Sequence, residues 1–256
     1  MKSFLAFFKK EILDSIRNGK FTVLGILFLI FGIMNPAIAK LTPWMLDLLS
    51  DSLSESGMVV TEVTVDALTS WTQFFKNIPI ALIVYVLIYG GTFTKEYESG
   101  TLILMLTKGL SRYKVVLAKF CVMFLTWTVG YFLCFAVTYG YNAYFWDNSI
   151  AAGLMPATGY WWLFGVWTIC LMTFFSVLGR NYAGVLLGTG GSVLAVYLIS
   201  FFPQIKEHTP TFLMNNTSLL IGAESADLFT KAVFITLILC VILVAASIPV
   251  MNKKRL

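Results

Sequence analysis

The sequence predicts an all-α membrane protein with six transmembrane helices and an amphipathic helix at its N-terminus. Of its 256 residues, 58% are hydrophobic and 12% are charged, whereas about a quarter of the residues in a soluble domain are charged. Six apolar stretches are each long enough to cross a bilayer, and lysine and arginine gather in alternate connecting segments. Together these observations place residues 1–256 in the membrane as a single domain.

The first element covers residues 1–20. Apolar side chains recur there at helical spacing, and charged residues fall between them, which is typical of an amphipathic helix on a membrane surface. The residues that define the pattern are Phe4, Phe7, Phe8, Lys9, Lys10 and Ile12. Such a helix either only anchors the chain or also contacts a partner, and the pattern does not choose between these roles.

The six apolar stretches follow as predicted spans. At 1.5 Å per residue, even the shortest of them covers about 28 Å, close to the hydrocarbon thickness of roughly 30 Å. The spans are predicted over residues 21–39, 74–93, 116–139, 160–178, 182–202 and 232–250. In the fifth span Gly184 and Gly188 form a G-x-x-x-G pair, which predicts close packing of this helix against another.

Lysine and arginine set the expected orientation. If both termini lie on one side, all but four of the 18 basic residues lie on that side too; the four are Lys40, Lys76, Lys206 and Lys231. Basic residues near the ends of spans keep their loops in the cytoplasm. The chain is therefore expected to be a multi-pass protein of the cell membrane with cytoplasmic N- and C-termini.

Residues that could carry chemistry are scarce. The only histidine is His208, and the four cysteines lie in apolar stretches without metal-ligand spacing, so no catalytic residue and no metal site are predicted. The chain has no G-K-[ST] phosphate loop, so it is expected to bind no cofactor itself. The spans lack ionisable residues near their centres, which disfavours an ion-coupled secondary transporter, although backbone carbonyls can also bind sodium.

The segment between the second and third spans is the most informative part of the sequence. Leu102, Leu106 and Leu110 recur at i, i+4 and i+8, which predicts a short helix with one apolar face over residues 96–108. A stiff helix on a cytoplasmic loop suits force transmission, but it would equally suit a helix that lies on the membrane surface.

This segment resembles the cytoplasmic signature of the ABC-2 type permeases, the membrane subunits of type V ABC exporters. The matching positions are Glu96, Glu98, Gly100, Thr101, Leu102, Leu104, Leu106, Ser111, Arg112 and Lys119. Two positions depart from the pattern: Gly109 stands where proline is common, and Ala118 stands where glycine is common.

The resemblance implies the type V exporter fold and a dimer of permeases, identical or different. Two separate ATP-binding cassette ATPase subunits would hold ATP and Mg²⁺, and no nucleic acid is expected among the partners. Residues 96–108 would be the coupling helix seated on the ATPase, beside the N-terminal connecting helix, and part of the third outward loop would form short outer helices. The residues expected to transmit movement are Glu96, Glu98, Gly100, Thr101, Leu102, Leu106 and Arg112.

The expected function is export of a hydrophobic or amphipathic substrate such as a peptide, an antibiotic or a lipid-like molecule. The alternatives are a sensor or immunity partner that removes a toxic peptide from the membrane, and a secondary transporter. An intramembrane enzyme would need paired acids or a histidine near a membrane surface. The only close pair of inward acids is Glu96 and Glu98, which already belong to the expected coupling helix, so this function is disfavoured.

Overall fold

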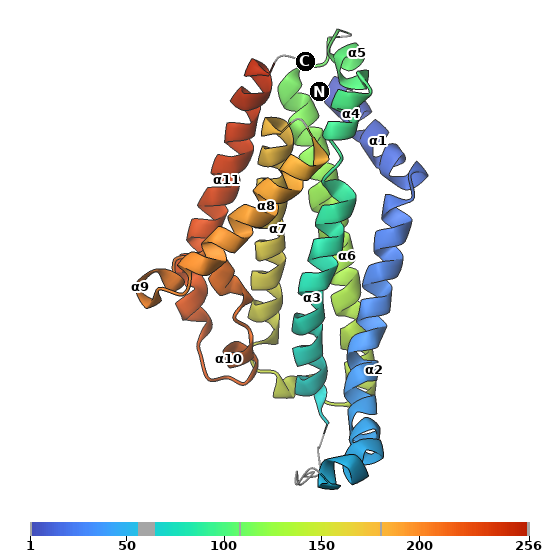
Figure 1. Ribbon diagram of the computed structural model, residues 1–256, viewed down its shortest axis with the longest axis vertical. Coiled ribbons are helices and arrows are strands. Elements are labelled where there is room, and N and C mark those ends of the chain that lie inside the picture. Colours follow the sequence, from blue (N-terminus) through green and yellow to red (C-terminus); the bar gives the residue numbers. More distant parts are fainter. Residues whose placement is uncertain (1, 56–64, 108, 180, 255–256) are drawn as a thin grey trace.

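The computed structural model describes residues 2–55, 65–107, 109–179 and 181–254, and these residues form helices without strands (Figure 1). The long helices are α1 (Lys2–Arg17), α2 (Lys20–Glu55), α3 (Ala67–Tyr89), α6 (Arg112–Phe145), α7 (Leu154–Leu178), α8 (Tyr182–Ile199) and α11 (Thr230–Lys253). The short ones are α4 (Thr94–Glu98), α5 (Thr101–Thr107), η1 (Asn148–Ile150), α9 (Pro203–Lys206), η2 (Pro210–Met214), α10 (Thr217–Leu220) and η3 (Ala226–Phe229).

Six of these helices are long and apolar enough to cross a membrane, as the sequence predicts. Their ends differ from the predicted ends. Helix α2 continues through the expected outer loop to Glu55, and α3 begins at Ala67, where the Asp66 side chain accepts a hydrogen bond from the Thr69 amide at 2.9 Å. Helix α3 also stops at Tyr89 rather than at residue 93, and α8 stops at Ile199 rather than at residue 202.

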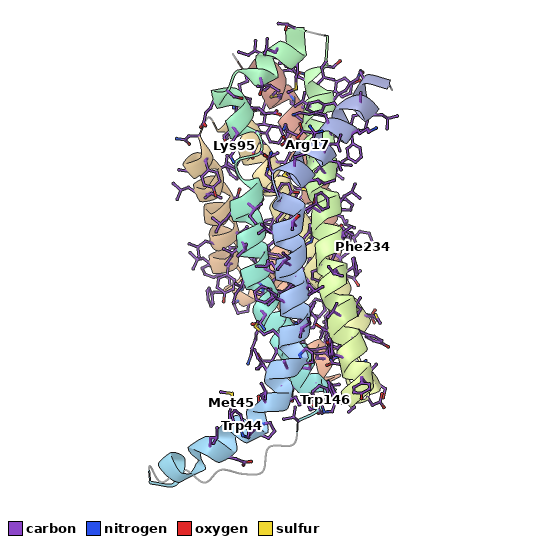
Figure 2. The ribbon with its side chains drawn as sticks, turned by 90° about the vertical axis from the view of Figure 1, so that its right-hand side faces the viewer. Arg17, Trp44, Met45, Lys95, Trp146 and Phe234 are labelled. Carbon is purple, nitrogen blue, oxygen red and sulfur yellow. The ribbon has the colours of Figure 1, made fainter. Side chains whose placement is uncertain are left out.

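Different helices lie at the two ends of the bundle. The N- and C-terminal ends lie together with α1, α4 and α5, whereas α10 and the far end of α2 lie toward the opposite end (Figure 1). Trp44 and Trp146 also lie toward that opposite end (Figure 2). An even number of spans returns the chain to its starting side, so the arrangement agrees with six crossings.

Helix α7 forms the centre of the bundle. In its most apolar window 78% of the residues are buried, compared with 11% in α8 and in the span of α11. Helix α7 packs against α11, α8 and α6, while α2 packs against α3 and α6. The outer faces of α8 and α11 are therefore left for lipid or for another protein.

Aromatic side chains fill the core between α3, α6 and α7. Their polar tips are paired: the Tyr85 hydroxyl donates to the Met123 carbonyl at 2.6 Å, and the Tyr131 hydroxyl donates to the Thr158 carbonyl at 2.9 Å. The Trp127 indole donates to the Trp162 carbonyl at 3.2 Å. An unpaired polar group costs several kcal/mol in a membrane interior, so these bonds fix the packing of the three helices.

Gly165 offers a test of this packing. A Cβ atom added there would lie 2.2 Å from the ring of Trp127, which is fully buried and held by its hydrogen bond. We expect Gly165→Ala to destabilise the protein by about 1–3 kcal/mol, because an overpacked core must shift. Gly159→Ala, on the same helix with open space around it, serves as the control and should leave thermal unfolding unchanged or slightly raised.

The segment between α8 and α11 folds back onto the bundle. Its short helices bury Phe212, Leu213, Leu219 and Leu220, and the ring of Phe212 stacks on that of Phe229 with centroids 4.6 Å apart. Helix η2 packs against α7 and α11. These contacts place part of the third predicted outward loop within the helical bundle.

Candidate coupling site and substrate groove

The segment expected to form one helix over residues 96–108 is two helices, which corrects the prediction. Helix α4 ends at Glu98 and α5 begins at Thr101, and between them Gly100 has a φ of 66°. This left-handed conformation is readily adopted by glycine and rarely by other residues, so the break is built into the sequence. Lys108, the last residue of the predicted helix, lies outside the described residues.

The apolar residues of α5 face two ways. Leu102 is completely buried, and Leu106 and Leu110 are packed against the core. Ile103 and Leu104 point outward, with 44% and 63% of their surface exposed. The face formed by Leu102, Leu106 and Leu110 thus packs against the rest of the chain. We call the exposed pair, Ile103 and Leu104, the outer face of α5.

Four charged side chains form a cluster behind this segment, three of them largely buried and one, Lys10, 41% exposed. The Lys119 ammonium on α6 lies 2.8 Å from Oε2 of Glu11 on α1 and 3.0 Å from Oε2 of Glu96 on α4. The Lys10 ammonium lies 2.8 Å from Oε1 of Glu11 and 2.7 Å from Oε1 of Glu96. This ion cluster of Lys10, Glu11, Glu96 and Lys119 therefore joins α1, α4 and α6.

Burial makes the pairing essential. Lys119 is 1% exposed and Glu11 is 4% exposed. Burial alone would raise the pKa of Glu11, but the nearby Lys119 charge and the hydrogen bonds from Lys10 and Lys119 outweigh it and hold the pKa below its ordinary value. Burial would likewise lower the pKa of Lys10, and its hydrogen bonds to Glu11 and Glu96 raise it instead. The ion pairs thus stabilise Glu11 and Lys10 in their charged forms.

The N-terminal helix turns its aromatic residues toward the bundle. Phe7 is 6% exposed and lies on the same face as Glu11, while Phe4 and Phe8 pack against the core. Lys9 is exposed and Ile12 is half-buried. Other apolar side chains of α1 point outward, namely Leu5, Leu13 and Ile16. Helix α1 thus packs against the fold and still presents apolar surface to its surroundings.

Arg112 ties the start of α6 to the end of α11. Its guanidinium donates to the carbonyls of Met251 at 2.7 Å, Asn252 at 2.9 Å and Lys254 at 2.8 Å. The Lys254 ammonium donates in turn to the carbonyls of Val177 and Gly179 at the end of α7. These cations satisfy carbonyls that a helix C-terminus leaves without intrahelical partners. We call this arrangement the C-terminal clamp.

The clamp also reaches α4. The Lys254 ammonium lies 4.0 Å from the centre of the Tyr97 ring, and the Tyr97 hydroxyl donates to the Met251 sulfur at 3.4 Å. Helices α4, α6, α7 and α11 therefore meet at one point.

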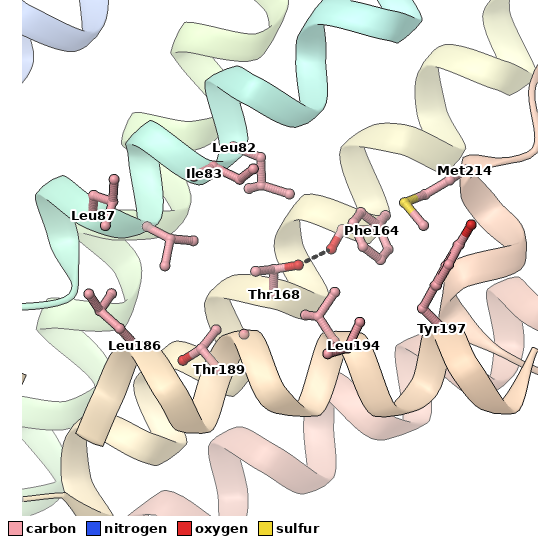
Figure 3. Close-up of a pocket in the computed structure, with 13 residues that line it drawn as sticks. Leu82, Ile83, Leu87, Phe164, Thr168, Leu186, Thr189, Leu194, Tyr197 and Met214 are labelled. Carbon is pink, nitrogen blue, oxygen red and sulfur yellow. Dashed lines mark hydrogen bonds between the residues drawn. The ribbon is translucent and has the colours of Figure 1, made fainter. Parts of the chain in front are cut away.

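An apolar groove of about 380 Å³ opens between α3, α7 and α8 (Figure 3). Its walls include Leu82 and Leu87 of α3, Phe164 of α7 and Leu194 of α8, and Tyr197 and Met214 stand at one end. No charged side chain lines it among the described residues. Such a surface suits an apolar ligand.

A family described as ABC-2 family transporter protein matches the chain over residues 5–255. The chain belongs to this family. No curated protein and no solved structure matches the chain. The family match confirms the resemblance seen in the segment between the second and third spans, and the protein is the membrane component of an ABC-type transporter, an ABC-2 permease.

The signature residues of the permease occupy different environments. Glu98 and Thr101 are exposed, Gly100 forms the break, Glu96 belongs to the ion cluster and Arg112 to the C-terminal clamp. Leu102 and Leu106 face the interior of the chain. The segment that carries the resemblance therefore combines surface residues with residues that support it from inside the fold.

The two glycines of the fifth span, Gly184 and Gly188, have different surroundings. A Cβ atom on Gly188 would lie 2.4 Å from the Phe175 ring, so this glycine lets α8 approach α7 closely. A Cβ atom on Gly184 would meet only the Asn181 side chain, which caps α8 by accepting from the Gly184 amide at 2.9 Å. Among the described residues of the permease, the expected helix contact at Gly184 is absent.

Sequence reasoning missed the partners within the ion cluster. Lys119 stands in the apolar run 115–125, and a lysine there signals a buried carboxylate partner. Glu11 lies one turn after Phe7 on α1, which places it on the face that packs inward. No spacing rule links these two positions, because more than 100 residues separate them in the sequence.

Proposed function

We propose that the permease exports a hydrophobic or amphipathic substrate, and that a separate ATP-binding cassette ATPase docks on α4 and α5. The observation that carries this proposal is the outer face of α5. Ile103 and Leu104 are exposed although they lie next to the fully buried Leu102, and exposed apolar residues on a rigidly held helix are typical of a binding surface. Glu98 and Thr101 would border the contact.

The docking end would lie in the cytoplasm with both termini. Arg112, Lys114, Lys119 and the lysines of α1 gather at this end, and the positive-inside rule keeps such segments in the cytoplasm. ATP and Mg²⁺ would be bound by the ATPase subunits, which the ABC-2 family normally requires.

Movement of the ATPase would pass to the spans through charge pairs. A displacement of α5 carries α4 with it, and Glu96 on α4 is paired with Lys119 on α6. A buried pair has a strong preference for one geometry, because separation exposes two uncompensated charges to an apolar environment. Helix α6 would therefore follow α4 rather than slide past it.

The substrate would use the apolar groove, and a second permease copy would pack beside it. The groove has no charged lining among the described residues, which suits a lipid-like molecule, an apolar antibiotic or the apolar face of a peptide. The nearby outer face of α8 is largely uncovered, so it offers surface for a second copy, identical or different.

Replacing Leu104 with aspartate tests the docking surface. Loss of an apolar anchor at the centre of an interface costs about 2 kcal/mol or more, roughly thirtyfold in affinity. We expect Leu104→Asp to remove most of the ATPase that co-purifies with the permease from its native membrane.

Leu48→Asp is the matched control. Leu48 is also a leucine with 63% of its surface exposed, but it lies on the far end of α2. The proposal predicts normal ATPase recovery with this variant. Equal recovery with Leu104→Asp, or an equal loss with Leu48→Asp, would contradict docking on α5.

A further inference from the structure

A second cavity, separate from the groove, lies where α1 turns into α2 and α3 turns into α4. It has a volume of about 410 Å³, and its lining is largely polar. Arg17 and Lys95 lie at the same level of the bundle on either side of this corner (Figure 2). Lys20 begins the first candidate span, and the second candidate span ends at Glu98. The cavity therefore lies at the edge of the bilayer.

The cavity is lined by three lysines and three carboxylates, and two of the lysines, Lys20 and Lys95, take no part in its ion pairs. The Lys20 ammonium donates to the Thr92 hydroxyl at 3.3 Å and lies 5.0 Å from the centre of the Tyr89 ring. The Lys95 side chain lies over Gly91, with its Cε 3.5 Å from the point that a Cβ on Gly91 would occupy. Within the described part of the chain, neither lysine is ion-paired with a carboxylate.

The acidic residues of the cavity are already engaged or lie at its rim. Glu11 and Glu96 are paired with Lys10 and Lys119, and Asp14 is exposed. Lys20 is largely buried, and the charges of Lys119 and Lys95 repel it, while those of Asp14 and Glu11 offset part of this repulsion. Like charges gathered in a partly enclosed site favour a bound anion, because the anion offsets their repulsion and their lost hydration.

We propose that this cavity binds the phosphate of an anionic phospholipid, with Lys20 and Lys95 as cationic ligands and the Thr92 hydroxyl as a hydrogen-bonding group. Lipid headgroups are the phosphates present at the edge of a bilayer, and basic pockets between membrane helices bind them. The bound lipid would bridge the α1–α2 corner to the α3–α4 corner. This site does not depend on the direction of transport or on the ATPase.

Native mass spectrometry of the purified permease tests the proposal. The protein is extracted from vesicles that contain equal amounts of phosphatidylglycerol and phosphatidylcholine, and the lipids that remain bound are counted. We expect the native protein to retain phosphatidylglycerol. We expect its preference over phosphatidylcholine to fall roughly fivefold for each lysine that is changed to glutamine, in Lys20→Gln, Lys95→Gln and the double variant.

Lys9→Gln is the matched control, because Lys9 is an exposed lysine of α1 that does not line the cavity. An unchanged preference in Lys9→Gln together with a loss in the double variant supports the site. An equal loss in Lys9→Gln would overturn it in favour of diffuse attraction by the basic surface. Displacement of the lipid by inorganic phosphate at millimolar concentration would also overturn it, since the site would then bind a free anion. Lys95→Gln alters an exposed side chain, so it keeps the test informative if Lys20 variants do not fold.

Discussion

Lys119→Met is expected to destabilise the permease by about 3–5 kcal/mol, because it removes the charge that neutralises two carboxylates in a nearly dry site. Oε2 of Glu11 lies 2.8 Å from the Lys119 ammonium, and Oε2 of Glu96 lies 3.0 Å from it. Lys10 would then be the remaining ion-pair partner of both carboxylates in the cluster. Its side chain is 41% exposed, so it neutralises them less effectively than the buried Lys119. Thermal unfolding in detergent, followed by the fluorescence of the seven tryptophans, measures the loss.

Two further variants distinguish the stability lost with the ion pairs from the stability lost by any lysine-to-methionine change on this helix. Lys114→Met changes a lysine on the same helix that donates to the exposed Ser3 hydroxyl at 2.9 Å, so the variant should unfold near the native temperature. Combining Lys119→Met with Glu11→Gln and Glu96→Gln removes the uncompensated charges and should restore most of the stability. A stable single variant, or a triple variant as unstable as the single one, would contradict the assigned role of Lys119.

Arg112→Gln is expected to loosen the C-terminal end of α11 and to weaken the proposed coupling between ATP hydrolysis and transport. The guanidinium serves three carbonyls of residues 251–254, and a hydrogen bond from a charged donor contributes about 1.5–3 kcal/mol. Backbone amides at the end of α11 should therefore exchange hydrogen at least about tenfold faster, since 1.4 kcal/mol corresponds to a factor of ten. Hydrogen exchange followed by mass spectrometry measures this change directly.

The functional effect of Arg112 needs its own control. Arg17→Gln removes an exposed arginine at the same end of the molecule and should change neither hydrogen exchange in α11 nor the number of ATP molecules hydrolysed per substrate. Arg112→Gln should raise that number while ATPase association persists, because Arg112 touches α11 and not the outer face of α5. Unchanged exchange in α11 would contradict the C-terminal clamp.

The sequence predicts the six spans because a bilayer demands about 20 apolar residues for each crossing, and few other constraints shape such segments. It does not predict that α2 continues to Glu55 or that α3 begins at Ala67. Those additional turns carry polar residues outside the hydrocarbon, where helix formation depends on capping and packing rather than on hydropathy.

Helices α1 and α5 each have an apolar face whose contacts the sequence does not predict. Periodicity identifies an apolar face, but it does not show what that face contacts. The Phe7 face of α1 packs on the bundle with Glu11 in its middle, and the Leu102 face of α5 packs inward. Ile103 and Leu104 are apolar and exposed on α5, and they lie outside the i, i+4, i+8 pattern of Leu102, Leu106 and Leu110. The ion cluster depends on contacts between distant parts of the chain, which no local pattern reveals.

An ATPase bound to the outer face of α5 would lie in contact with residue 104. A photoreactive amino acid in place of Leu104, activated in intact cells, should therefore form a covalent product between the permease and an ATP-binding cassette subunit. The same group in place of Leu48 should form no such product. Products with lipid alone at position 104, or capture of the ATPase from position 48, would contradict ATPase binding at α5.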